Sequence, residues 1–242
     1  MSYSEESLVR FFKIAKKIYT NEKFAYQNKL RDFFIRAKVE YKAYKKIKRE
    51  VDRYLSTDFN FMKILSPDEN KLSDLIKILL EPEGIHGQGT KFLKLFLEIL
   101  SQNVGRSFEY EPSKVKIERE KATDKNRRID LFIDLGEFVI AIENKPWAGE
   151  RESQVEDYFN WLQEKYGDNF LLIYLHGTGE EPTSIRREAV ENNRDKLLFT
   201  SYHKLLRPWL EKCYRECESQ KVRFFIKDFI DWIKENFREQ TY

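Results

Sequence analysis

The charged residues Glu143 and Lys145 stand at the end of an apolar segment, 139–142, that is typical of a buried β-strand. Successive side chains of a strand point to opposite faces, so Glu143 and Lys145 should share a face. Burying a charge is costly unless it is paired or bound to something. The pattern therefore predicts either a salt bridge or a chemical site at this strand end.

A predicted β-hairpin brings Asp130 to the same place. Gly136 suits the first central position of a two-residue turn of type II′, where φ is positive. If Leu135 and Phe138 flank this turn, the register places Asp130 opposite Glu143. The other expected cross-strand pairs are Leu131 with Ile142, Phe132 with Ala141, Ile133 with Ile140 and Asp134 with Val139.

Opposed carboxylates are unfavourable in a strand pair, and two partly buried ones do not both ionise unless a cation compensates them. Lys145 could supply part of that charge. A divalent ion would supply more, and carboxylate oxygens favour Mg²⁺, Mn²⁺ or Ca²⁺. The alternative is a purely structural cluster of Asp130, Glu143 and Lys145 at a solvated strand end.

The surrounding pattern predicts a fold in which helices and strands alternate around one sheet. The expected order after residue 66 is helix, helix, three strands, helix, two strands and two helices. Such an order is typical of an α/β sandwich. The expected helices are 67–81, 90–103, 151–166, 203–218 and 223–237, and the expected strands are 114–120, 128–135, 137–145, 169–176 and 197–202.

Residues 1–65 differ from the rest of the chain and form a separate helical region in this interpretation, with 66–242 as the second domain. Residues 5–19 and 22–55 carry helical periodicity without Gly or Pro, and we expect two or three helices arranged as a hairpin. The apolar stripe of this region includes Phe33, Phe34, Ala37, Tyr41 and Tyr44. It would serve core packing or recruit a partner.

Residues 1–54 contain 15 Lys and Arg against 7 Asp and Glu, a net charge of +8, so the remainder of the +3 chain carries −5. Bases crowd one part of this region, which is either a solvated helix face or a surface for nucleic-acid phosphates. The candidate binding residues are Lys42, Lys45, Lys46, Lys48 and Arg49.

Several classes of protein are not indicated by the composition. No apolar run is long enough for a membrane span and the first residues are polar, so we expect a cytoplasmic protein without a membrane partner. Cys213 and Cys217 do not complete a zinc site and are expected to be reduced thiols. His86, in the turn-rich sequence HGQG, is expected to order its loop through hydrogen bonds.

The arrangement of Asp130 followed by Glu143-Asn144-Lys145 resembles the signature of the PD-(D/E)XK nuclease superfamily. The segments LLEPEGIHGQGTKFL and AGERESQVEDYFNWL, with Gln154 and Tyr158, resemble one bacterial branch of that superfamily. The resemblance covers about 67–205. The chain has Ile129 where the superfamily's name places a proline, and residues 1–65 lie outside the similarity.

The resemblance implies a restriction-endonuclease-like, three-layer α/β core with a mixed central sheet, to which the all-helical N-terminal region is added. Asp130 and Glu143 would hold Mg²⁺ or Mn²⁺, with the carbonyl of Asn144 and the carboxylate of Glu69 as further ligands. Lys145 would orient the nucleophile or stabilise charge on phosphate oxygens. Gln154 and Tyr158 would support the site from one face of the next helix.

The expected function is therefore a metal-dependent nuclease, a hydrolase that cuts phosphodiester bonds of nucleic acid and most naturally a DNA endonuclease. Superfamily members that cut both strands often act as dimers, so a homodimer is among the expected partners, although the sequence marks no dimer surface. Two alternatives use the same fold without cleavage: a module that binds nucleic acid, and a module that binds another protein.

Overall fold

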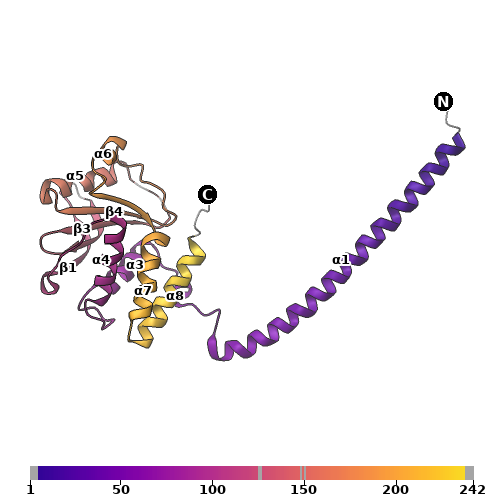
Figure 1. Cartoon of the computed structure of the whole chain (residues 1–242), viewed down its shortest axis with the longest axis horizontal. Coiled ribbons are helices and arrows are strands. Elements are labelled where there is room, and N and C mark those ends of the chain that lie inside the picture. Colours follow the sequence, from indigo (N-terminus) through magenta and orange to yellow (C-terminus); the bar gives the residue numbers. More distant parts are fainter. Residues whose placement is uncertain (1–4, 125–126, 148, 150, 238–242) are drawn as a thin grey trace. The chain divides into compact units, whose positions relative to one another are not determined.

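The computed structural model describes residues 5–124, 127–147, 149 and 151–237. The chain separates into two compact units, residues 1–59 and residues 60–242 (Figure 1).

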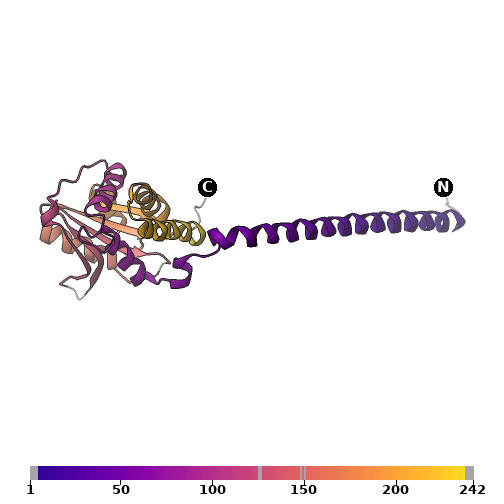
Figure 2. The same cartoon turned by 90° about the horizontal axis from the view of Figure 1, so that it is seen from below.

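The first unit is built on one uninterrupted helix, α1 (Glu5–Leu55), 51 residues long, and Figures 1 and 2 both show it without a break. The expected helical hairpin is therefore wrong. Thr20 and Asn21, between the two expected helices, lie within α1, and the Thr20 hydroxyl donates to the carbonyl of Lys16 one helical turn earlier, at 2.8 Å. Without Gly or Pro, nothing in this segment ends the helix.

The second unit contains a five-stranded mixed sheet, which confirms the predicted α/β class. Its strands lie in the order β1-β2-β3-β4-β5, antiparallel from β1 to β3 and parallel from β3 to β5. All five expected strands are present with small shifts of their ends. Their bounds are β1 (Lys116–Ala122), β2 (Arg128–Asp134), β3 (Val139–Lys145), β4 (Phe170–His176) and β5 (Leu197–Ser201).

The hairpin between β2 and β3 has the register that the sequence predicts. Leu131 pairs with Ile142 and Asp134 with Val139, and the Leu135 N–H donates to the Phe138 carbonyl at 2.9 Å. Gly136 has a φ of 100°, a conformation that glycine adopts more readily than other residues. The pairing ends at Leu131 and Ile142, so the expected pair of Asp130 with Glu143 is not part of it. Asp130 and Glu143 lie just beyond the last pair, at the same end of two adjacent strands.

Helices cover both faces of the sheet and complete three layers (Figure 1). One face packs against α3 (Glu69–Leu80), α4 (Lys91–Val104), α7 (Arg207–Glu216) and α8 (Gln220–Asn236), and the other packs against α5 (Gln154–Tyr166). Each face forms its own apolar cluster because strand side chains alternate. The sequence prediction missed α2 (Phe61–Leu65), α6 (Arg187–Asn192) and the single turn Pro112–Lys114. The helix expected at 203–218 begins as the π-helical turn Tyr202–Leu206 and continues as α7.

Two predictions about single residues are confirmed. The His86 Nε2 lies 2.9 Å from the Glu81 carbonyl, while its Nδ1 accepts from the Gln88 N–H at 3.0 Å, so the imidazole orders the loop. Cys213 and Cys217 are buried free thiols. Among the described residues, no helix combines the length and the apolar character that crossing a membrane requires.

Candidate active site

The six candidate catalytic residues come from four elements. Asp130 lies on β2, Glu143 and Lys145 on β3, Glu69 in the first turn of α3, and Gln154 and Tyr158 on α5. Direct contacts join five of these side chains into one cluster. Asp130 is connected to it through a hydrogen bond to the main chain of β3. Except for Glu69, all of them are at least nine-tenths buried.

Lys145 links the two carboxylates that flank it. Its Nζ lies 3.0 Å from Glu143 Oε1 and 2.6 Å from Glu69 Oε1. Burial by itself works against the charged ammonium, but Glu143 and Glu69 outweigh it and raise the pKa of Lys145. The side chain is therefore a fixed positive charge held inside the site.

Glu143 has one oxygen that is engaged and one that is not. Its Oε1 accepts from Lys145 and from Gln154 Nε2, the latter at 2.6 Å. Its Oε2 is buried and has no hydrogen-bond partner among the described residues. Burial first, and the nearby charge of Asp130 second, raise the pKa of Glu143 to about 8. A buried acceptor without a partner calls for an explanation, and a bound cation would provide one.

Asp130 is anchored to the neighbouring strand. Its Oδ2 accepts the backbone N–H of Asn144 at 2.8 Å. Burial raises the pKa of Asp130, although the Asn144 N–H and the charge of Lys145 act in the opposite direction. Arg119 on β1 contacts the main chain of the same residue, since its guanidinium donates to the Asp130 carbonyl. The same guanidinium also donates to the carboxylate of Asp74 on α3.

The side chain of Asn144 is part of a buried network that sequence reasoning missed. Its Nδ2 donates to Ser73 Oγ at 2.9 Å, and its Oδ1 accepts from the Tyr202 hydroxyl at 2.7 Å. Ser73 and Tyr202 have no exposed surface. The network thereby fixes the residue between Glu143 and Lys145 to α3 on one side and to the π-helical turn on the other.

Gln154 and Tyr158 share a face of α5, as their four-residue spacing predicts. Gln154 Nε2 donates to Glu143 and also lies 3.1 Å from the Tyr158 hydroxyl, which donates to the Arg128 carbonyl at 2.7 Å. The backbone N–H of Arg151 donates to Gln154 Oε1 at 3.1 Å, which identifies the amide oxygen. This chain of bonds orients Glu143.

His176 is a second residue that the sequence prediction did not include. It pairs with Lys145 in the parallel register of β3 and β4, so the two side chains project to the same face. Its Nδ1 accepts from the N–H groups of Thr178 and Glu180, at 3.3 and 3.1 Å. Because Nδ1 accepts these bonds, the ring hydrogen lies on Nε2, which is then available as a donor.

The donor set at the strand ends suits a hard divalent cation. Asp130 and Glu143 are buried carboxylates, and Glu143 Oε2 lacks a partner among the residues described. The described residues contain no group of three or more His, Cys, Asp and Glu side chains arranged to hold a metal. A metal would therefore be held by two carboxylates together with backbone or water oxygens, or by Glu69 after it leaves Lys145.

The candidate phosphate-binding residues all lie on α1, in the other unit. Lys48 is engaged there, since its Nζ forms ion pairs with Asp52 and Asp58. Lys45 lies 4.8 Å from the centre of the Tyr41 ring. Lys42, Lys46 and Arg49 are exposed.

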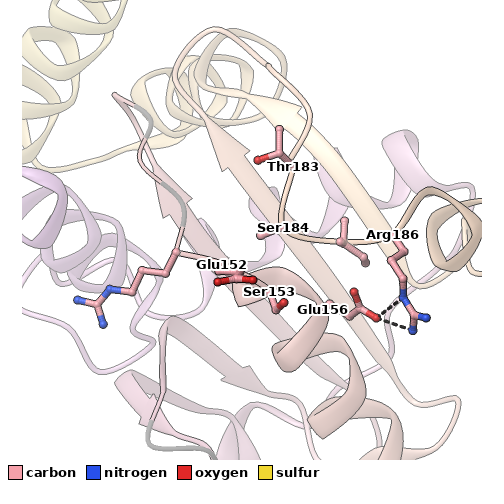
Figure 3. A pocket seen from close by; sticks show the side chains of 8 residues that line it. Glu152, Ser153, Glu156, Thr183, Ser184 and Arg186 are labelled. Atoms are coloured by element: carbon pink, nitrogen blue, oxygen red, sulfur yellow. Dashed lines mark hydrogen bonds and ion pairs between the residues drawn. The ribbon is translucent and has the colours of Figure 1, made fainter.

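An open pocket of about 430 Å³ adjoins the site at the start of α5. Figure 3 shows it between the start of α5 and the segment that carries Thr183 and Ser184, with Arg186 paired to Glu156 across one side. Arg151 connects it to the site through the bond to Gln154. Its described lining residues are Arg151, Glu152, Ser153, Glu156, Thr183, Ser184, Ile185 and Arg186.

A mixed sheet with two acids and a lysine at the ends of adjacent central strands defines a class of nuclease-like α/β folds. The sequence profile of the PD-(D/E)XK nuclease superfamily matches residues 59–231. The chain belongs to this superfamily, whose members are usually nucleases that use divalent metals. Neither the curated proteins nor the solved structures contain a match. The matched range leaves α1 outside.

Proposed function

We propose that this chain is a metal-dependent phosphodiesterase that hydrolyses nucleic acid, with DNA as the substrate and internal bonds as the point of cleavage. The observation that carries the proposal is the buried pair Asp130 and Glu143 beside the fixed ammonium of Lys145. A fold would gain no stability from two such carboxylates, since both have raised pKa values. The free energy that burying Asp130 and Glu143 costs is explained if a cation and a phosphate complete the site.

Asp130 and Glu143 would hold Mg²⁺ or Mn²⁺, with the Asn144 carbonyl as a further oxygen donor. Glu69 would join them when Lys145 releases it. When bound, such a metal lowers the pKa of a coordinated water and polarises the scissile phosphate.

The remaining residues would orient the site and stabilise the negative charge that develops on the phosphate during hydrolysis. Lys145 would stabilise negative charge on a phosphate oxygen or orient the attacking water, because its ammonium is held charged beside Glu143. Gln154 would keep Glu143 Oε1 occupied so that Oε2 faces the cation. Tyr158 would hold Gln154 in place.

The basic residues of α1 would supply contacts to the phosphate backbone. Lys42, Lys46 and Arg49 are exposed on a helix of net positive charge, which favours electrostatic attraction of nucleic acid. Lys45 and Lys48 belong to the same group, although Lys48 must give up its ion pairs to contribute.

Calorimetric titration with Mn²⁺ tests the site without a guess at the substrate. The wild type and Asp130→Asn are compared with Glu137→Gln, a matched control that removes an exposed acid from the same hairpin. We expect binding to the wild type and to the control and loss of binding in Asp130→Asn. If none binds, the titration is repeated with a DNA duplex present, since phosphate oxygens can complete a metal shell.

Cleavage of a supercoiled plasmid then tests the reaction itself. The wild type should nick or linearise it with Mg²⁺, while Lys145→Ala should bind DNA and leave it intact. Absence of metal binding both with and without DNA would overturn the proposal and favour a module that binds nucleic acid without cutting it.

A further inference from the structure

The described part of α1 exposes large apolar side chains along its entire length. Twenty of them, from Leu8 to Leu55, are between 39% and 83% exposed. Monomeric proteins seldom expose continuous apolar surface on this scale, and a long helix is normally stabilised by packing its apolar face. A partner surface is therefore needed to cover α1.

These side chains follow the spacing of a coiled coil. Steps of three and four residues trace one line along the helix, which we call the ladder, and 12 of its 14 positions are apolar. From Leu30 to Leu55 the steps alternate strictly, as in heptads. The ladder consists of Leu8, Phe12, Ala15, Tyr19, Glu22, Tyr26, Leu30, Phe34, Ala37, Tyr41, Tyr44, Lys48, Val51 and Leu55.

The two sides of the ladder differ in character. One side, the basic flank, carries Val9, Lys16, Lys23, Arg31, Lys38, Lys45 and Asp52. The opposite side, the apolar flank, carries Phe11, Ile18, Ala25, Phe33, Glu40, Ile47 and Tyr54. This asymmetry decides which orientation of two such helices is favourable.

In an antiparallel pair each flank meets its own kind, so the basic flanks would face each other and repel. In a parallel pair the basic flank of one helix meets the apolar flank of the other. The lysine stems can then cover aromatic and aliphatic side chains while their charges stay in water. Glu40 also comes within reach of Lys45 of the second copy, five residues further along.

We propose that α1 pairs with α1 of a second copy of this chain as a parallel, in-register coiled coil. A lipid surface is the less favourable occupant, because Glu22, Glu40 and Lys48 lie in or beside the stripe that would enter the apolar layer. Lys42, Lys46 and Arg49 lie outside the ladder and both flanks, so pairing leaves them exposed.

The orientation has a consequence that rests on the proposed function. Each chain continues from Leu55 into its second unit, residues 60–242, which we call the nuclease unit after its superfamily. Parallel helices would therefore deliver two active sites to the same end. Antiparallel helices would deliver them to opposite ends of a helix roughly 75 Å long, from about 1.5 Å per residue. Two sites at one end suit the two strands of a duplex.

Light scattering of the full chain measures the pairing. Phe34→Glu/Tyr41→Glu places two charges in the ladder, and Phe24→Glu/Ile35→Glu places them at exposed apolar positions outside it. We expect twice the chain mass for the wild type and for the second variant, and the mass of one chain for the first. A monomeric wild type at high micromolar concentration would overturn the proposal, as would equal effects of both variants.

Disulfide cross-linking of Phe12→Cys, near the N-terminal end of the ladder, measures the orientation. Mild oxidation should join two chains, because only parallel helices bring residue 12 of both copies together, whereas the buried Cys213 and Cys217 should not react. A dimer that fails to cross-link refutes the parallel arrangement. Binding of wild-type monomers to anionic vesicles would instead assign the ladder to a lipid surface.

The Mn²⁺ titration separates this inference from the proposed function. Phe34→Glu/Tyr41→Glu changes no residue of the candidate active site, so it should bind Mn²⁺ like the wild type. A paired chain that binds no metal would overturn the nuclease proposal and leave the pairing of α1 intact.

Discussion

The two units of this chain treat apolar side chains in opposite ways. In residues 60–242 the large apolar residues form two clusters, one on each face of the sheet, and most of their members are nearly inaccessible to solvent. On α1 they are exposed. The nuclease unit can therefore be stable as a single copy, whereas α1 depends on what covers its ladder.

The two units also differ in where they keep charge. The basic residues of α1 lie on its surface, while Asp130, Glu143 and Lys145 are withdrawn from water at the strand ends. Surface charges cost little and can attract a polyanion over a distance. Buried acids reduce the stability of the metal-free protein, and their presence is what points to chemistry.

Matched phenylalanine truncations should show the largest contrast between the units. Phe96 is fully buried and its ring lies 5.3 Å from that of Trp209, whereas Phe34 on α1 is 61% exposed. We expect Phe96→Ala to lower the free energy of unfolding by about 3–5 kcal/mol through loss of packing and creation of a cavity. Urea unfolding, followed by tryptophan fluorescence, measures it, since all four tryptophans lie in the nuclease unit.

Phe34→Ala should leave the urea transition of the nuclease unit, followed by tryptophan fluorescence, unchanged. It should weaken only the helicity of α1, measured by circular dichroism, and that helicity should depend on protein concentration. The concentration dependence follows because pairing couples helix stability to mass action. If Phe34→Ala lowers the stability of the nuclease unit as much as Phe96→Ala does, the division into two independently stabilised units is wrong.

The contrast also explains what the sequence could predict. The β2–β3 register followed from local information, because Gly136 defines the turn and alternation then assigns every pair. The hairpin predicted for residues 5–55 is wrong because residues 20 and 21, between the two periodic segments, continue the helix. Polarity does not end a helix when the residues are helix formers and Thr20 bonds to its own helix.

Glu143→Gln tests how much the burial of the Glu143 carboxylate lowers the free energy of unfolding. With its pKa raised from 4.5 to about 8, Glu143 binds its proton more tightly in the folded state. Its contribution to stability is therefore complete below pH 4.5 and is lost as the pH rises through about 8. In metal-free buffer with a chelator, we expect the ionisation of Glu143 to lower the free energy of unfolding of the wild type by roughly 4–5 kcal/mol across this range.

Glu143→Gln should lose much less stability over the same range, since the amide does not ionise, and Glu137→Gln should follow the wild type. Urea unfolding at a series of pH values measures all three. Parallel curves for the wild type and Glu143→Gln would show that the ion pair with Lys145 compensates Glu143 fully, and the argument for a strained carboxylate would fail.

The supporting residues of the site could not be predicted from the sequence. Asn144 is held by Ser73, 71 residues earlier, and by Tyr202, 58 residues later. No periodicity or motif signals such a contact, because it depends on how α3 and the π-helical turn pack on the sheet. The carboxylates were predictable because the hairpin register, which brings Asp130 and Glu143 to one end of β2 and β3, is set by local sequence.

Tyr202→Phe should lower the free energy of unfolding by less than Phe96→Ala does, and it should also weaken Mn²⁺ binding at the candidate active site. The change leaves the buried Oδ1 of Asn144 without the donor that lies 2.7 Å away, which costs about 1–3 kcal/mol. Because Asn144 lies between Glu143 and Lys145, we expect weaker Mn²⁺ binding as well. Unfolding by urea and calorimetric titration give the two readouts.

Tyr214→Phe serves as the control, because it removes a hydroxyl from a partly buried tyrosine on α7 that lies outside the Asn144 network. If Tyr202→Phe loses stability but binds Mn²⁺ like the wild type, the network supports the fold and does not position the site.

The smallest expected effects concern the exposed bases of α1. Replacing Lys42, Lys46 and Arg49 with Gln should weaken binding to a DNA duplex without changing the unfolding of the nuclease unit. If all three contact phosphates, the slope of log affinity against log salt should fall by about 3, at roughly 0.9 per contact. Fluorescence anisotropy at several salt concentrations measures that slope.

A triple variant with the same loss of charge in the nuclease unit separates local contact from net charge. Lys94, Lys204 and Lys221 are exposed and belong to none of the ion pairs found among the described residues. Replacing them with Gln should leave the salt slope close to that of the wild type. Equal slopes for the two triple variants would mean that α1 attracts nucleic acid only through the total charge of the chain, and that its helix serves pairing alone.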